Sequence, residues 1–256
     1  MATGAITDYL DVAQLALYAF WVFFALLVYY LTIESKREGF PLEYDSGNKV
    51  RRAAGLAGMP APKTFRTKYD GDVTVPRDEP LERLKAQPAR LNGSPIEPLT
   101  DAPLADGIGP GAYANRMDVP DRHVDGSPRI KPMRLLPGFS IAKQDTDPRG
   151  LSVVGADGVR GGSVKEVWVD SMELMIRYFE IETSAEFGGQ RVMLPMNFCR
   201  VGRKNISVQA ILGKQFAGVP TLKSNEQITL LEEEKVMAYY GAGTLYATPE
   251  RKEPLL

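Results

Sequence analysis

Cysteine and histidine are almost absent from this chain, which has one of each among 256 residues: Cys199 and His123. A single cysteine cannot close an internal disulfide, which fits a reducing compartment. One histidine excludes a two-histidine zinc site of the H-E-x-x-H type, and the two residues together are too few for a Cys/His metal cluster. We therefore expect no metal site, and Cys199 is most simply a small buried apolar residue.

Nucleotide and acyl-transfer motifs are also missing. There is no P-loop and no G-x-S-x-G, and the glycine-rich stretch 107–111 stands in a proline-rich loop rather than at a strand–helix junction. The net charge of −1 leaves no basic surplus to neutralise phosphates, so nucleic acid is not expected as a partner. These absences argue against an enzyme, and a membrane-tethered hydrolase is the weakest alternative.

What the sequence does have is a run of 22 uncharged residues, Val12–Ile33. As a helix rising roughly 1.5 Å per residue it can cross a bilayer core of about 30 Å. A secretory signal peptide is disfavoured because no basic residue precedes the run and no A-x-A-like site follows it. A buried helix of a soluble protein is disfavoured by the length. The run predicts a transmembrane helix over 12–33.

Basic residues are found only after this run. Lys36 and Arg37 follow it, then Lys49, Arg51 and Arg52, whereas residues 1–11 carry no positive side chain. The positive-inside rule predicts a periplasmic N-terminus at 1–11 and a cytoplasmic C-terminal body.

Proline dominates the next part of the chain, residues 34–135, which hold 13 of the 19 prolines. No helical or strand period is visible there, so we expect few regular elements. Disorder is one explanation. The recurring apolar residues favour a second, an extended segment that lies on the surface of a partner.

Strand patterns begin after this segment and define a predicted domain over 136–256. Six short β-rich runs with turns between them predict a small antiparallel barrel. The expected strands are 139–142, 151–154, 164–169, 175–181, 190–194 and 206–210. A helix is expected over 230–240, with Leu230, Met237 and Tyr240 on one face and Gly241 just past its end. The predicted fold is thus one transmembrane helix and a mainly β cytoplasmic domain with a C-terminal helix.

Two acidic clusters are candidates for proton chemistry. The first holds Asp121, His123 and Asp125, and the second holds Asp170 and Glu173, followed by Arg177. A histidine among carboxylates exchanges protons near neutral pH, and a carboxylate buried beside another acid has a raised pKa. The plain alternative is a polar loop and a turn at a strand end.

Short segments spread along the whole chain carry a family resemblance. They are KREGFPLE at 36–43, PKTF at 62–65, DGIGP at 106–110, IKPM at 130–133, DPRGL at 147–151, WVD at 168–170, FAGVP at 216–220, LEEEK at 231–235 and YATPER at 246–251. In this order, they resemble the H subunit of the photosynthetic reaction centre of purple bacteria.

The resemblance implies a PRC-barrel domain and a subunit that is structural rather than enzymatic. Such a subunit binds no pigment and caps the cytoplasmic face of the L and M subunits. The surrounding complex holds bacteriochlorophyll, bacteriopheophytin, quinones, a non-haem iron and a carotenoid, and a cytochrome subunit and light-harvesting antenna are further partners. The expected location is the inner (intracytoplasmic) membrane.

The resemblance also assigns a role in carrying protons from the cytoplasm to the secondary quinone. It maps this route onto Asp170, Glu173 and Arg177, with Glu173 the strongest candidate. Uptake from the cytoplasm maps onto Asp121, His123 and Asp125. Some members have two histidines in that loop, whereas this chain has Asp125 and Ser127, so surface zinc is not expected. Lys36 and Arg37 are candidates for binding lipid headgroups.

One alternative from another functional class stays open on the sequence. A membrane-anchored adaptor could use the same barrel to bind a different cytoplasmic protein. The proteins that co-purify with the chain would distinguish the two hypotheses.

Overall fold

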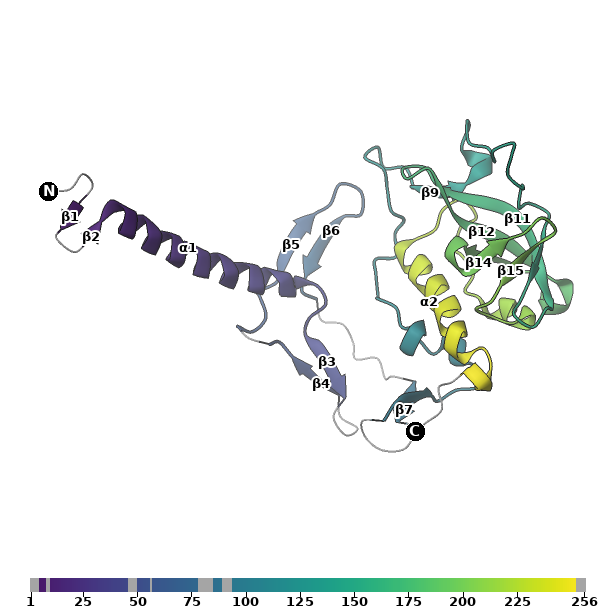
Figure 1. Cartoon of the computed structure of the whole chain (residues 1–256), viewed down its shortest axis with the longest axis horizontal. Coiled ribbons are helices and arrows are strands. Elements are labelled where there is room, and N and C mark those ends of the chain that lie inside the picture. Colours follow the sequence, from purple (N-terminus) through teal and green to yellow (C-terminus); the bar gives the residue numbers. More distant parts are fainter. Residues whose placement is uncertain are drawn as a thin grey trace. The chain divides into compact units, whose positions relative to one another are not determined.

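The computed structural model describes residues 5–7, 10–45, 50–55, 57–77, 85–88 and 94–251 and forms two compact units, Met1–Leu81 and Glu82–Leu256 (Figure 1). Lys49 and residues 1–4, 8 and 9 of the predicted periplasmic segment lie outside the described residues.

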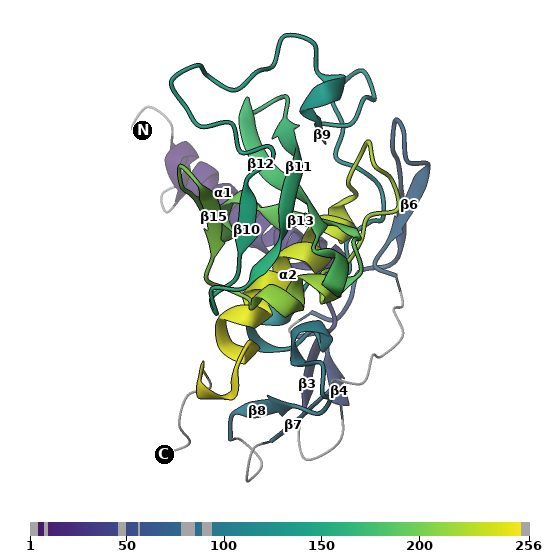
Figure 2. The ribbon, with the colours of Figure 1, turned by 90° about the vertical axis from the view of Figure 1, so that its right-hand side faces the viewer.

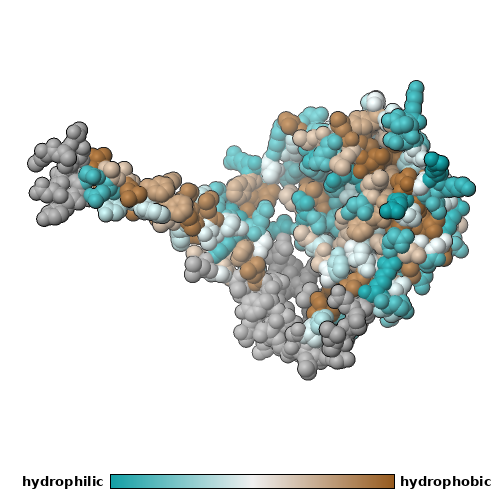
Figure 3. All heavy atoms as spheres, in the orientation of Figure 1, coloured by the Kyte–Doolittle hydropathy of each residue, from teal (hydrophilic) through white to brown (hydrophobic). Residues whose placement is uncertain are grey.

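Helix α1, Val12–Glu34, is the predicted apolar helix. Asp11 caps its first turn, because its carboxylate accepts from the Gln14 N–H at 2.7 Å while the Gln14 side chain accepts from the Asp11 N–H at 3.3 Å. Thr32, the other polar residue of the run, donates to the Val28 carbonyl at 2.7 Å. None of the side chains of α1 is buried, and apolar side chains line it (Figure 3). An apolar helix that buries no side chain against the described residues fits a membrane span.

Short two-stranded pairs interrupt the proline-rich segment, so the expectation of few regular elements is only partly right. Each strand has two to four residues, which is too short for a period to be recognised in the sequence. In this segment the pairs are β3 (Leu42–Asp45) with β4 (Val50–Ala53), β5 (Lys63–Arg66) with β6 (Asp72–Val75), and β7 (Ala86–Pro88) with β8 (Ile96–Pro98). A further pair, β1 (Ala5–Thr7) with β2 (Leu10–Asp11), precedes α1.

A curled seven-stranded sheet forms the centre of the second unit (Figure 2). Its order is β13-β12-β11-β10-β15-β14, with β9 paired to β11. The strands are β9 (Ile130–Pro132), β10 (Ser152–Val154), β11 (Arg160–Asp170), β12 (Met175–Thr183), β13 (Arg191–Pro195), β14 (Cys199–Val201) and β15 (Asn205–Val208). Strands β10 and β15 are parallel and the other pairs are antiparallel.

Strand β11 makes the sheet curl. Its first residues pair with β10 and its last three, Trp168 to Asp170, pair with β9, while β12 pairs with it from Gly162 to Asp170. The register with β12 shifts twice, between Val164 and Glu166 and between Trp168 and Val169. Such bulges bend a strand and increase its twist. The result is the predicted small barrel-like sheet, with Trp168, Phe179, Ile181 and Leu194 fully buried inside it.

Helix α2, Leu230–Tyr246, packs beside β13 and extends further than predicted. Thr229 and Glu232 form a capping box at its start. The expectation that Gly241 follows the helix is wrong, since the helix continues through Gly241 and Gly243. A side chain at either glycine would collide with a backbone carbonyl, that of Pro110 at 2.4 Å for Gly241 and that of Ala210 at 2.4 Å for Gly243. These glycines allow close packing of the helix rather than ending it.

The sheet differs from the prediction in three respects. An entirely antiparallel barrel was expected, whereas β10 and β15 are parallel. The expected strand 139–142 is wrong, because Phe139 and Ile141 pack against the core from an irregular segment. Strands β9 and β14 were not predicted, and each has three residues. Eight short 3-10 helices connect the elements in the described chain: Ser35–Arg37, Pro103–Ala105, Gly109–Gly111, Met133–Leu135, Ala185–Phe187, Met196–Phe198, Gly213–Gly218 and Pro249–Arg251.

Candidate functional site

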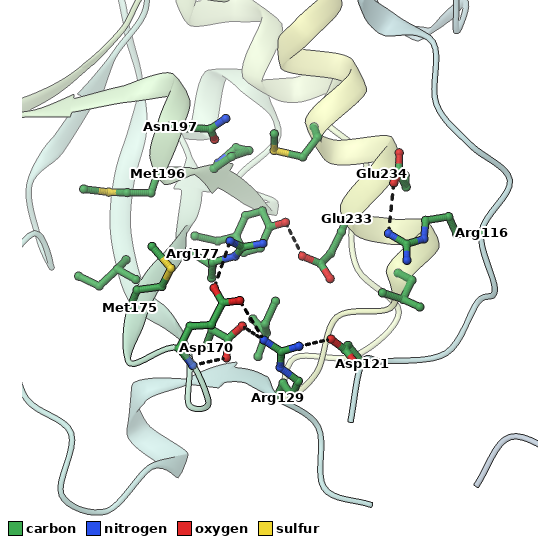
Figure 4. A pocket seen from close by; sticks show the side chains of 17 residues that line it. Arg116, Asp121, Arg129, Asp170, Met175, Arg177, Met196, Asn197, Glu233 and Glu234 are labelled. Carbon is green, nitrogen blue, oxygen red and sulfur yellow. Dashed lines mark hydrogen bonds and ion pairs between the residues drawn. The ribbon is translucent and has the colours of Figure 1, made fainter. Parts of the chain in front are cut away.

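An open cleft of about 690 Å³ lies in the second unit where the β11–β12 turn, the loop before β9 and helix α2 meet (Figure 4). Eight of its 17 lining residues are charged, and apolar residues such as Met175, Met196 and Met237 form much of the remaining wall. The charged residues are Arg116, Asp121, Arg129, Asp170, Glu173, Arg177, Glu233 and Glu234. Asp121 of the first predicted cluster therefore meets Asp170 and Glu173 of the second here, although 49 positions separate Asp121 from Asp170 in the sequence.

Arg129 joins these clusters. Its guanidinium donates to Asp121 at 2.6 Å, to Asp170 at 2.8 Å and to Glu173 at 3.3 Å. The planar guanidinium is well suited to bridging carboxylates, because its five N–H donors point in fixed directions. In Figure 4 the side chain lies between Asp121 and Asp170.

The β11–β12 turn fixes the position of Asp170. One carboxylate oxygen accepts from the N–H of Met172 at 2.9 Å and from that of Glu173 at 3.1 Å, and the other accepts from Arg129. Asp170 is the last residue of β11 and is buried. Leu174, which closes the turn, has a φ of 55°, in the left-handed region that non-glycine residues seldom adopt.

The charges of the cleft compensate the burial of Asp170. Burial by itself would raise the pKa of this carboxyl, but the backbone N–H donors and Arg129 outweigh it, so the pKa lies below its usual value. Burial also disfavours the charge on Arg129, yet Asp170 and Asp121 overcome this and raise the pKa of the guanidinium. Asp170 and Arg129 therefore stay charged near neutral pH.

His123 reaches this group indirectly. Its Nε2 lies 2.7 Å from the Ser171 hydroxyl, which itself donates to the Arg129 carbonyl at 2.8 Å. Because a hydroxyl has one proton to donate, the contact with Ser171 requires the Nε2–H form of His123. The histidine is thus tied to the β11–β12 turn through Ser171 rather than through a carboxylate.

Asp125 does not line the cleft. It is exposed, and its carboxylate accepts from the Ser127 N–H at 2.8 Å. This backbone donor lowers the pKa of Asp125.

Arg177 does line the cleft and lies 3.8 Å from Glu173, a longer ion pair than those of Arg129 with the two aspartates. The structure therefore brings Asp121, Asp170, Glu173 and Arg177 together and leaves Asp125 outside.

The cleft also contains a hydrogen-bonded pair that was not predicted, Tyr178 and Glu233. The buried Tyr178 hydroxyl donates to Glu233 of α2 at 2.7 Å. Burial raises the pKa of Glu233, and the Tyr178 hydrogen bond offsets only part of this rise. The sequence did contain a signal, since Glu233 stands three residues after Leu230 and four before Met237, on the predicted apolar face of the helix.

Lys36 and Arg37 lie in the first unit, directly after α1, and bond within that unit. Lys36 is 4% exposed and donates to the Gly58 carbonyl at 3.0 Å. Arg37 pairs with Glu34 at 2.7 Å and donates to the Ala61 carbonyl at 2.9 Å. Both cations thus have protein partners.

Within the described residues, no group of three or more His, Cys, Asp or Glu side chains is arranged to hold a metal ion. The same residues include one helix long and apolar enough to cross a membrane, that of α1.

Two family matches cover most of the chain. Residues 141–215, which include β10 to β15, match the PRC-barrel domain. Residues 4–135, which include α1 and the proline-rich segment, match the N-terminal region of the photosynthetic reaction centre H-chain. Because the second match spans more than half of the sequence and the fold agrees with both, the chain belongs to the photosynthetic reaction centre H-chain family.

Proposed function

We propose that this chain caps the cytoplasmic face of the L and M subunits and helps to deliver protons to the secondary quinone. The family is that of a structural subunit, and membership implies a complex with L and M, pigments and quinones. Capping and proton delivery are the specific roles proposed here. The observation that carries the proton role is the ionic cleft, where Asp121, Asp170 and Glu173 gather around Arg129.

The chemistry of quinone reduction explains why such a cleft is useful. A doubly reduced quinone takes up two protons, and apolar protein conducts protons poorly. Ionisable groups and water must therefore bridge the distance from the cytoplasm. Asp121 lines the cleft, His123 contacts Ser171 of the β11–β12 turn, and Asp125 is exposed outside the cleft. These three residues are proposed to take up protons, and Asp170, Glu173 and Arg177 are proposed to pass them on.

Membrane anchoring by α1 accompanies this role. We propose a single pass through the inner (intracytoplasmic) membrane with residues 1–11 in the periplasm and 136–256 in the cytoplasm, because Lys36 and Arg37 follow the helix. Lys36 and Arg37 are also proposed to meet lipid headgroups. Their existing partners within the chain mean that substituting them should weaken lipid contact only slightly. A cytochrome subunit, antenna proteins and a carotenoid are proposed neighbours on the resemblance alone.

Replacing Glu173 by glutamine tests the proton role. We expect flash-induced proton uptake and the second electron transfer to the secondary quinone to slow by about 100-fold, at the low end of the effect of losing a positioned acid–base group. Glutamine keeps the shape and hydrogen bonding of the side chain but cannot bind and release a proton. The measurement is dye-monitored proton uptake in the purified complex.

Glu182→Gln is the matched control. Glu182 is exposed to a similar degree, 42% against 50% for Glu173, and pairs with Lys165 outside the cleft. Equal rates in the two variants and the wild type would remove Glu173 from the route. An unchanged absorbance spectrum of the complex would exclude an assembly defect as the cause of slower uptake.

Co-purification tests the capping role. Detergent extraction of the native membrane should yield this chain together with two other membrane subunits, L and M, and the absorbance of bacteriochlorophyll. Recovery of this chain without pigment, bound to another cytoplasmic protein, would favour the adaptor alternative.

A further inference from the structure

Arg129 was not among the predicted site residues, yet three separate segments converge on it. Asp121 comes from the loop, Asp170 from the last position of β11, and Glu173 from the turn that follows. The Arg129 side chain is 19% exposed, and its Nε is buried with no acceptor among the described residues. A long cationic side chain is seldom held so deeply unless paired carboxylates compensate its charge.

The three carboxylates differ in how firmly they are held. Asp170 uses both oxygens, one for two backbone N–H groups and one for Arg129 at 2.8 Å. Asp121 accepts from Arg129 at 2.6 Å and from the N–H of Arg122 at 2.8 Å. Glu173 has longer contacts, 3.3 Å to Arg129 and 3.8 Å to Arg177, and its side chain is half exposed. Short charge-assisted hydrogen bonds favour the carboxylate form most strongly.

The remaining charged groups around this arrangement have partners of their own. On α2, Glu234 pairs with Arg116 at 3.6 Å, and Glu233 accepts from Tyr178 of β12. In the loop, His123 contacts Ser171. Arg177 of β12 contacts Glu173 and lies on the cleft wall. Arg129 is therefore the guanidinium that contacts all three acids.

We infer that Arg129 is a positioning residue that holds Asp121 and Asp170 in place by short ionic hydrogen bonds and leaves Glu173, with its longer contacts and half-exposed side chain, as the group that passes a proton on. The inference rests on the proposed proton route and specifies that Glu173 is the residue of the cleft through which the proton passes. A proton from the cytoplasm binds a Glu173 carboxylate oxygen, and the same carboxyl releases it toward the quinone side, so the residue returns to its starting state. Arg129 itself stays charged throughout, because its pKa is raised by its neighbours.

Replacing Arg129 by glutamine in the intact complex tests this inference through the pH profile of proton uptake. Arg129 helps to lower the pKa of Asp170, so the midpoint of the profile should move upward by about one pH unit without it, as expected for loss of an opposite charge within hydrogen-bonding distance. Arg129→Lys should move it by less, because an ammonium keeps the charge but cannot contact three carboxylates at once.

Arg149→Gln is the matched control, since Arg149 forms a forked pair with Asp147 at 2.6 to 3.1 Å outside the cleft. It should leave the pH profile in place. A wild-type profile in Arg129→Gln together with slow uptake in Glu173→Gln would overturn the role of Arg129 and leave the proton route standing. Wild-type behaviour in both would overturn the route as well. If Arg129→Gln does not assemble, Arg129→Lys decides, and an unshifted midpoint in that variant overturns the inference.

Discussion

Replacing Gly243 by alanine will destabilise the Glu82–Leu256 unit by about 2 kcal/mol, within the usual range for overpacking a well-packed interior. Helix propensity alone predicts the opposite sign, because alanine is favoured over glycine inside a helix by roughly 1 kcal/mol. The sign of the measured change therefore shows which effect controls this position.

The packing of α2 explains the expected sign. A β-carbon at Gly243 would stand 2.4 Å from the Ala210 carbonyl oxygen and 2.5 Å from a methyl group of Ile211. The carbonyl belongs to the backbone and Ile211 is fully buried, so neither neighbour has room to withdraw. The helix must move away from the segment after β15, which loosens its apolar contacts. Arg251 donates to the carbonyls of both Ala210 and Gly243, and these two hydrogen bonds would be distorted as well.

Denaturant unfolding of the full chain in detergent, followed by the fluorescence of the fully buried Trp168, measures the effect. Thr244→Ala is the control in the same helix, because Thr244 is the exposed neighbour of Gly243. It should change the free energy of unfolding by less than about 0.5 kcal/mol, as is usual for surface positions. A stabilised Gly243→Ala would mean that the close approach to Ala210 is not tight in solution.

Gly241 and Gly243 also illustrate where sequence reasoning stops. The apolar residues of α2 and its acidic first turn are local signals, and they predicted the start of the helix correctly. Its end was predicted wrongly, because a glycine that ends a helix and one that admits a neighbouring carbonyl look the same in a sequence. The difference depends on Pro110 and Ala210, which are distant in the chain.

The transmembrane helix and most strands could be predicted because their signals are also local. Twenty-two uncharged residues specify α1 by composition, and the runs of β10 to β13 and β15 specify strands by their β-branched and aromatic residues. Strands β9 and β14 have three residues each and owe their conformation to their neighbours in the sheet. Phe139 and Ile141 gave a false strand signal, since apolar side chains can pack on a core without pairing.

The candidate site follows the same division. Its acids were visible as clusters in the sequence. Arg129, which joins them, is one of 31 Lys and Arg residues, and no pattern in the neighbouring sequence distinguishes it from the others. Glu233 did carry a mark, because an acid at the middle of an apolar helix face must be buried, paired or functional. Glu233 is the acidic residue on the otherwise apolar face formed by Leu230 and Met237, and this position alone would have made it a candidate.

The pair formed by Tyr178 and Glu233 gives the second large expected effect. Tyr178→Phe should destabilise the protein by about 1.5 to 3 kcal/mol at neutral pH, the usual contribution of a hydrogen bond to a charged group. The hydroxyl is buried and donates to the carboxylate at 2.7 Å. Without it, the pKa of Glu233, already raised by burial, should rise further.

The sign of the pH dependence follows from that raised pKa. The folded protein binds a proton on Glu233 more tightly than the unfolded chain, whose value is the usual 4.5. The stability contributed by the protonated form is therefore fully present below pH 4.5 and is lost as the pH rises through the folded pKa. Tyr178→Phe should deepen this loss, whereas Glu233→Gln, which carries no charge at any pH, should remove it.

A double-mutant cycle separates this coupling from general damage to the core. Tyr178→Phe should cost much less in the Glu233→Gln background than in the wild type at pH 8, and the two costs should converge below pH 4.5. Unfolding free energies measured across this pH range test both statements. A cost of Tyr178→Phe that is the same at every pH would show that the phenol contributes by packing alone. A cost confined to high pH would establish Glu233 as a carboxylate that is charged in the folded cleft only because Tyr178 donates to it.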